Sequence, residues 1–411
     1  MASCNAERTL LALASRLLMR VALPFLTFFS VLCGYFVLRP VRDEIGVRAG
    51  IENLSWLFTW TFVATLLLVP IFGWIVARAP RRVIATTTYA LCAVLLVGAY
   101  VGVQGSNIVA WGVGLFIGIS VLNLFIISVF WSLMADAYDE GEARKMYGII
   151  AIGGTLGTIA GPAITAALAP VIGPMNLLPI SAGFLTLAAV LSTLVPRRAD
   201  APPQQRIGGS ILAGIKVTLQ SPTLLRVALI IICYTTVSTI LYFEQVDIVK
   251  NSFTDSGERT RFFALLDLAN NVTTILVQAL ITRQVLTRFG LRTALTAAPA
   301  IIGTGLALLA FAPRLIFIAF LQVVHRAGEH GFTRPGREVL FTTVGAEERY
   351  KGKNFVDTFV YRGNDALIAW ALEGLHRIGV GLSGIAALGV AVAAGWAWNG
   401  YTLGRKHDHK A

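Results

Sequence analysis

The chain has 411 residues, of which 56% are hydrophobic and only 14% are charged, and it carries a formal net charge of +12. Soluble proteins contain about 25% charged residues, so this composition excludes an ordinary soluble domain. Nucleic-acid binding would need a basic patch on a soluble surface, and the sequence offers none. Apolar runs of roughly 20 residues recur along the chain, and each is long enough to cross a bilayer.

Taken in chain order, the apolar runs predict an all-α membrane protein with twelve transmembrane helices in two six-helix bundles. The expected helices cover residues 17–38, 53–77, 82–103, 108–135, 147–170, 174–195, 223–246, 260–286, 291–312, 314–342, 354–378 and 380–404.

A polar segment from Pro196 to Pro222 separates the first six helices from the last six. We therefore expect an N-terminal bundle (1–195), a cytoplasmic linker (196–222) and a C-terminal bundle (223–411). Within the linker, residues 210–220 have apolar side chains at helical spacing, which predicts a short helix at the membrane surface.

The distribution of basic residues predicts the orientation. With both termini in the cytoplasm, most of the 34 Lys and Arg residues fall in cytoplasmic segments, as the positive-inside rule requires. The sequence thus predicts a multi-pass protein of a bacterial inner membrane, with the lipid bilayer as its surroundings and no nucleic acid as a partner. A monomer is expected, although the sequence leaves the oligomeric state open.

The two halves echo each other weakly. Tyr35-Phe36 corresponds to Tyr242-Phe243, and the basic loop 78–82 corresponds to 288–292. Two six-helix halves joined by a cytoplasmic linker resemble transporters of the major facilitator superfamily. The loop Gly73-x-x-x-x-Arg78-x-x-Arg81-Arg82 is also similar to that superfamily's signature, although Ala77 stands where the signature usually has Asp. The resemblance implies transport by alternating access.

One glycine-rich stretch needs a separate interpretation. Gly153, Gly157 and Gly161 recur at every fourth residue in an apolar run. No strand precedes them, so a phosphate-binding loop is not favoured. The spacing predicts a stripe of small residues that lets two membrane helices approach closely.

Charged clusters mark both ends of the predicted transport path. Arg39-Pro40-Val41-Arg42-Asp43-Glu44 follows the first apolar run, and about 22 helical residues place it roughly 33 Å from the cytoplasmic face. Arg334-Pro335-Gly336-Arg337-Glu338 ends the tenth predicted helix near the cytoplasm. Charged groups at membrane depth usually face a cavity, a partner or a substrate.

These clusters predict two gates. The outer gate would pair Arg39 or Arg42, beside Asp43, with Glu244 or Asp247. The inner gate would pair Arg334 or Arg337, beside Glu338, with Asp136. Each pair would close one face as the halves rock. The alternative is that these charges only snorkel or cap helix ends.

The middle of the path carries the predicted substrate site. Arg326 and His330 are four residues apart and share a helix face, and Arg362 lies near the middle of the next predicted helix. Guanidinium groups suit bidentate binding of carboxylate or phosphate. The prediction is a small-molecule anionic or zwitterionic substrate held by Arg326 and Arg362, with a purely structural arginine–acid network as the alternative. The full set of substrate-binding candidates is Arg39, Arg42, Asn123, Tyr242, Glu244, Arg326, His330, Tyr361, Arg362 and Asn364.

Proton coupling needs a carboxylate or histidine whose protonation a dry site can alter. The candidates by position are Glu244, Glu329, His330 and Asp365. An exchanger needs none of them for coupling, so symport, exchange and efflux stay open at this point.

Two stretches resemble the nucleotide (ATP/ADP) translocases of plastids and intracellular bacteria. Leu38-Arg39-Pro40-Val41-Arg42-Asp43 is similar to that family's Leu-Arg-Asp-Thr-Lys-Asp, which places Arg42 on its functional Lys. Phe130-Trp131, followed by Glu142-Ala143-Arg144-Lys145-Met146-Tyr147, is similar to its Phe-Trp and Glu-Ala-Lys-Arg-Phe-Tyr. The chain departs from the family where Asn123 stands near the position of a functional Glu. The resemblance implies ATP/ADP exchange as one candidate function.

The residues together predict a secondary transporter of a small organic anion or zwitterion, with nucleotide exchange as one form of it. Proton-coupled symport or efflux of another solute is the alternative. No cofactor or metal is expected, and an integral-membrane enzyme is less favoured. His325 and His330 are five residues apart rather than four, and no H-E-x-x-H motif is present.

Overall fold

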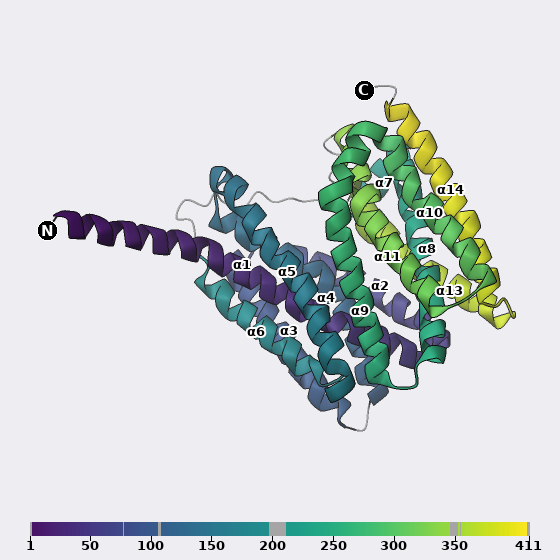
Figure 1. Cartoon of the computed structure of the whole chain (residues 1–411), viewed down its shortest axis with the longest axis horizontal. Helices are drawn as coiled ribbons and strands as arrows, with labels where there is room; N and C mark the ends of the chain where they lie inside the picture. The colour runs from purple at the N-terminus through teal and green to yellow at the C-terminus, as the bar shows by residue number, and fades with distance from the viewer. Residues whose placement is uncertain are drawn as a thin grey trace. The chain divides into compact units, whose positions relative to one another are not determined.

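The structure is a computed structural model that describes residues 2–76, 78–105, 108–196, 211–345, 352–353 and 355–408, and the side chains of these except 2–18, 108 and 211–214. Nearly all of this part of the chain is helical, as expected from the apolar runs (Figure 1). Ala77 and most of the linker lie outside the described residues.

Six helices form the first half of the chain. They are α1 (Ala2–Ala49), α2 (Ile51–Val76), α3 (Arg81–Val103), α4 (Ile108–Ala137), α5 (Glu140–Ile172) and α6 (Leu177–Leu194).

Three predicted helix ends in this half were wrong by more than a few residues. The first helix, expected over residues 17–38, starts at Ala2 and continues through Pro40 and the charged cluster to Ala49. It ends at Gly50, whose φ of 81° is the left-handed conformation that glycine adopts at helix C-termini. The fifth helix starts at Glu140 rather than 147, because Asp139 and Glu142 form a capping box at its N-terminus.

The second half begins with the short helix α7 (Ile211–Gln220), which confirms the helix predicted within the linker. The long helices that follow contain several π-helical turns. The elements are α8 (Pro222–Ser252), α9 (Ser256–Val277), η1 (Gln278–Thr282), η2 (Val285–Phe289), α10 (Gly290–Phe311), α11 (Leu315–Gly328), η3 (Glu329–Thr333), α12 (Arg334–Thr342), η5 (Phe355–Val360), α13 (Tyr361–Arg377) and α14 (Leu382–Asp408).

Ten helices of the described chain are long and apolar enough to cross a membrane. The two further predicted spans are the helical stretches 315–342 and 355–377. They hold most of the predicted site residues and their π-helical turns, which occur frequently at functional sites. Their polar residues lower their hydropathy, so the predicted site residues and the low hydropathy coincide in the same helices.

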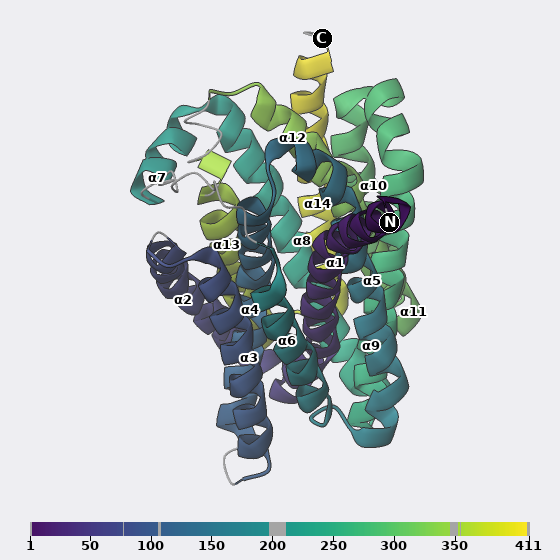
Figure 2. The same cartoon turned by 90° about the vertical axis from the view of Figure 1, so that its left-hand side faces the viewer.

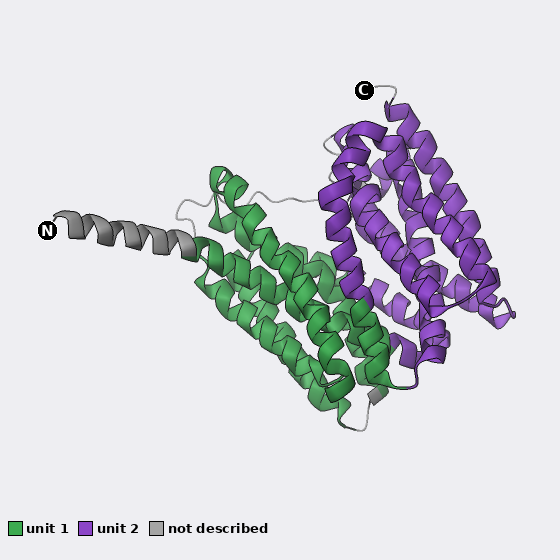
Figure 3. Cartoon of the chain, in the orientation of Figure 1, with its two compact units in different colours: residues 1–45, 67–206, 255–265 green, residues 46–66, 207–254, 266–411 purple. Residues whose placement is uncertain are grey.

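The contacts divide the chain into two compact units (Figure 3). Unit 1 comprises residues 1–45, 67–206 and 255–265, and unit 2 comprises residues 46–66, 207–254 and 266–411. Neither unit is one continuous stretch of the chain. Residues 46–66 belong to unit 2 although they precede most of unit 1, and residues 255–265 belong to unit 1 although they lie within the second part of the chain.

Within unit 1, α5 packs closely on α1 through the predicted stripe of small residues. A side chain at Gly157 would place its Cβ 2.5 Å from the carbonyl oxygen of Phe29, and one at Gly161 would come 2.7 Å from that of Cys33. Those distances are too short for any Cβ, so the stripe is confirmed as a close helix contact. Helix α3 packs along α6 in the same unit.

Within unit 2, α8 lies against α14, α13 and α11, and α10 runs beside α14 (Figure 2). The last turn of α14 also caps α10, because Asp408 accepts hydrogen bonds from the backbone N–H groups of Leu291 (2.9 Å) and Arg292 (3.1 Å). This unit therefore provides the framework for the polar helices 315–342 and 355–377.

Candidate functional site

The charged end of α1 is tied to the first turn of α9 inside unit 1. Arg259 donates from Nε and Nη2 to the two carboxylate oxygens of Glu44, both at 2.8 Å. The Glu44 side chain is fully buried and that of Arg259 is 13% exposed. This bidentate ion pair is the strongest form of carboxylate–arginine contact. Arg259 was absent from the predicted site.

The other residues of the same cluster have local contacts. Arg42 bonds to the neighbouring Asp43, and its guanidinium lies 5.4 Å from the centre of the Phe116 ring. Arg39 lies 5.8 Å from the centre of the Phe36 ring. The predicted outer gate, in which Arg39 or Arg42 meets Glu244 or Asp247, would join the two units and stays a prediction.

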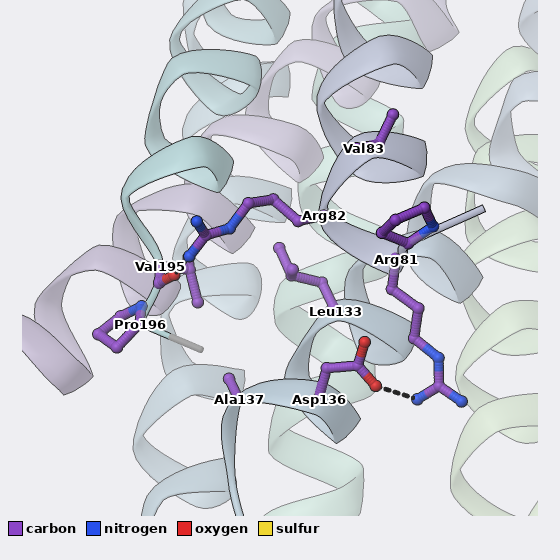
Figure 4. Close-up of a pocket in the computed structure, with 9 residues that line it drawn as sticks. Arg81, Arg82, Val83, Leu133, Asp136, Ala137, Val195 and Pro196 are labelled. Atoms are coloured by element: carbon purple, nitrogen blue, oxygen red, sulfur yellow. Dashed lines mark hydrogen bonds and ion pairs between the residues drawn. The ribbon is translucent and has the colours of Figure 1, made fainter. Parts of the chain in front are cut away.

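The start of α3 and the end of α4 line a small pocket in unit 1 (Figure 4). Arg81 binds Asp136 at 2.8 Å on one side of this pocket. On the other side, Arg82 donates a hydrogen bond to the carbonyl oxygen of Val195. Arg81, the first residue of α3 and part of the signature-like stretch, therefore forms an ion pair with α4. Asp136, predicted to meet Arg334 or Arg337, has its described partner within its own unit.

The predicted inner-gate arginine of α12 sits in a buried acidic setting in unit 2. Arg337 binds Glu329 at 2.9 Å and Asp357 at 3.4 Å. Glu329 belongs to the π-helical turn η3 and Asp357 to η5. The neighbouring Glu338 is half-exposed and binds Lys353 at 2.6 Å, whereas Arg334 is exposed. Arg337 therefore links two helices of unit 2.

The two arginines of the predicted substrate site also lie in unit 2, each next to an aspartate. Arg326 of α11 is 3.4 Å from the buried Asp267 of α9. Arg362 of α13 is 3.6 Å from Asp365 in the same helix. Their side chains are 27% and 20% exposed. Both guanidinium groups therefore keep partial access while contacting an acid loosely.

Three other predicted residues take part in packing. Asn364 donates from its amide nitrogen to Thr235 Oγ1 at 2.7 Å and to Thr236 Oγ1 at 3.0 Å, which holds α13 to α8. His330 lies 3.1 Å from the carbonyl oxygen of Arg326. Tyr242 packs edge-on against Phe58. Asn123, on α4 of unit 1, is partly exposed.

An aromatic cluster lies beside the polar residues, and of its members only Tyr361 was among the predicted site residues. Tyr234 of α8 stacks on His325 of α11 with ring centres 4.7 Å apart and planes nearly parallel. Trp396 of α14 meets both rings edge-on, and Tyr361 lies 6.1 Å from Tyr234. The cluster fixes the position of α11 and α13 beside α8.

Glu244 differs from the other acids of unit 2. Its side chain is 1% exposed, and neither carboxylate oxygen has a hydrogen-bond partner among the described residues. The adjacent Gln245 instead accepts a hydrogen bond from Gln322 of α11. Within the described chain, no group of three or more His, Cys, Asp or Glu side chains is arranged to hold a metal ion.

Comparison with known proteins identifies the family. Residues 21–323 match the model of the Major Facilitator Superfamily. No curated protein matches the sequence. Solved structures give similarity of fold over nearly the whole chain at low sequence identity.

Three of these structures illustrate the range of solutes. The nucleoside transporter NupG is 12% identical, with 94% of this chain and 98% of that one covered and a TM-score of 0.69. A bacterial homologue of the iron transporter ferroportin, in an inward-facing state, is 14% identical (93% and 98% covered, TM-score 0.64). A bacterial homologue of the human lysosomal transporter Spinster, inward-facing and unoccupied, is 15% identical (94% and 93% covered, TM-score 0.59).

None of these similarities supports the resemblance to nucleotide translocases. The family match covers most of the chain, and the helical order agrees with it. This multi-pass membrane protein belongs to the Major Facilitator Superfamily of transporters.

Proposed function

We propose that the protein is an alternating-access secondary transporter of a small zwitterionic or anionic organic solute, bound at Arg326 and Arg362. The observation that carries the proposal is the pair of partly exposed arginines within membrane helices. Each has one aspartate partner at a long ion-pair distance, 3.4 Å for Arg326 and 3.6 Å for Arg362. A guanidinium group has five N–H donors, so one long contact leaves donors for a carboxylate or phosphate.

The aspartate beside each arginine favours a zwitterion over a simple anion. Arg326 lies next to Asp267, and Arg362 lies next to Asp365. A zwitterion brings its own cation, which one of the aspartates accepts while an arginine accepts the anionic end.

The contacts between α2 and α13 support a transport cycle in which the ends of these two helices move apart. Within unit 2, Ser55 near the start of α2 donates to Glu373 near the end of α13, and Trp370 donates to Thr59 at 2.9 Å. These residues lie far apart in the sequence and are joined by side chains alone. We propose that they, together with the Glu44–Arg259 pair, separate during transport, whereas the predicted gates form in other steps of the cycle.

Nucleotide exchange is a narrower form of this proposal and rests only on the short resemblance at 38–43 and 130–147. Proton-coupled movement of the solute is favoured by a specific observation, the unpartnered carboxylate of Glu244. An integral-membrane enzyme has no such observation in its favour.

A thermal-shift screen of the purified protein against amino acids, organic acids and nucleotides tests the proposal. A solute at a hundredfold excess over its dissociation constant stabilises the folded protein by about 2.7 kcal/mol. The expected result is stabilisation by a zwitterion that Arg326→Gln removes, while Arg314→Gln, at an exposed position at the start of the same helix, retains it. Equal stabilisation of both variants would refute binding at Arg326.

A further inference from the structure

Glu244 lies in an environment that does not suit a charged carboxylate. It belongs to the interior of α8, and its side chain is almost completely inaccessible to solvent. Both of its carboxylate oxygens lack a hydrogen-bond partner among the described residues. A buried ionised carboxylate is tolerated when an arginine, a lysine or several N–H donors compensate its charge, and here none does.

The charged groups around α8 do not supply this compensation. On α8 itself the nearest is Asp247, a further acid one helical turn away, whose carboxylate accepts a hydrogen bond from Asn251. The titratable groups on the elements packed against α8 have described partners of their own: His325 with Tyr234, Arg326 with Asp267, Arg362 with Asp365, Asp357 with Arg337, and Glu373 with Ser55 and Arg377. Lys250, further along α8, is exposed, and the basic residues 405–407 lie in the last turn of α14. Lys216 belongs to α7, which precedes the start of α8, whereas Glu244 lies towards the other end of α8.

The other acids of unit 2 provide the comparison. Glu329, Asp357 and Asp365 are each within ion-pair distance of an arginine, so each has a reason to be ionised. Glu244 is more deeply buried than any of these three acids and has no such partner among the described residues. Binding a proton removes its charge, and this is the form that its surroundings accommodate.

We propose that Glu244 is a reversible proton-binding site, protonated in the conformation seen here and ionised in a conformation that opens it to water. In one water-exposed conformation the carboxylate binds a proton from the solution. In a later water-exposed conformation the carboxyl group releases that proton to the solution, so no other reactant is needed. This inference rests on the proposed transport function, because a site that changes exposure during the cycle links proton movement to solute movement.

Covalent labelling by dicyclohexylcarbodiimide tests the site without any solute. This reagent attacks protonated carboxylic acids in apolar surroundings and leaves an adduct that peptide mass spectrometry locates. The protein is labelled in native membranes over a range of pH. We expect labelling of Glu244 whose rate falls about tenfold for each pH unit above the titration midpoint, as the protonated fraction does.

The variants and comparison residues make each outcome decisive. Glu244→Gln should remove this adduct while unfolding at a temperature close to that of the wild type, and Glu140→Gln, at an exposed position, should leave the adduct unchanged. The ion-paired Glu329 serves as an internal comparison. Absence of the Glu244 adduct at every pH, faster labelling of Glu329, or a rate that does not change with pH would each overturn the proposal.

The labelling experiment is independent of transport. If the solute screen fails and Glu244 is nevertheless labelled with the expected pH dependence, the proton site stands and only the assignment of the solute site fails. If a solute binds at Arg326 and Glu244 shows no such labelling, the proton site fails alone.

Discussion

Replacing Arg259 with Gln should destabilise the protein strongly, because it leaves a fully buried carboxylate without its counter-charge. Glu44 is 0% exposed, and both of its oxygens accept from Arg259 at 2.8 Å. Removing one partner of such a pair costs about 3–5 kcal/mol, most of which is the penalty of the uncompensated charge. The double variant Glu44→Gln/Arg259→Gln removes that penalty and should recover a large part of the loss.

The neighbouring Arg261 provides the control. It lies on the same helix, two residues further on, and its pair with Glu258 is about half-exposed and 3.7 Å long. An exposed pair of this kind contributes about 0–1 kcal/mol, so Arg261→Gln should be nearly neutral. Folded fractions measured during a titration with denaturing detergent give the four free energies of unfolding. A loss for Arg259→Gln no greater than that for Arg261→Gln would refute the reasoning.

Three further predictions follow from the packing and the ion pairs. Gly161→Ala should destabilise by about 1–3 kcal/mol because its Cβ would clash with the backbone of α1, whereas Gly148→Ala, where nothing lies within 4 Å, should cause no loss of thermal stability. Arg81→Asp should lower stability and Arg81→Asp/Asp136→Arg should restore it, and recovery of less than half of the loss would argue against the 2.8 Å pair. Arg337→Gln should lower the free energy of unfolding by about 3–5 kcal/mol, because it leaves the buried carboxylate of Glu329 without the arginine that it contacts. A stability equal to that of the wild type in a denaturing-detergent titration would contradict this.

The helices were the part of the fold that the sequence determined most clearly. Runs of about 20 apolar residues have few alternatives in a membrane protein, because only helices and closed barrels satisfy every backbone hydrogen bond there. The small-residue stripe at Gly153, Gly157 and Gly161 was predictable for a similar reason, since its period alone indicates a close contact.

Helix ends were less predictable because local polarity was misleading. The charged residues from Arg39 to Glu44 suggested that the first helix had ended, yet it continues to Ala49. Proline at position 40 did not stop it, since proline is tolerated in membrane helices whose surroundings satisfy the freed backbone groups. The helix ends at Gly50, which adopts the left-handed conformation.

The partners of charged residues could not be predicted, because they depend on contacts between distant parts of the sequence. Glu44 and Arg259 are 215 residues apart, and no local pattern connects them. Asp136 was predicted to meet Arg334 or Arg337, although Arg81 is held beside it within the same unit. The side chain of Asn364 looked available for a solute, whereas its amide bonds to α8.

The most direct test of the central claim is solute counterflow in liposomes that contain the purified protein. Labelled amino acids, organic acids and nucleotides are offered in turn to vesicles preloaded with the same unlabelled compound. We predict saturable uptake of at least one zwitterionic solute, lost in Arg326→Gln and retained in Arg314→Gln. Uptake that persists unchanged in Arg326→Gln, or an absence of uptake for every compound offered, would contradict the account.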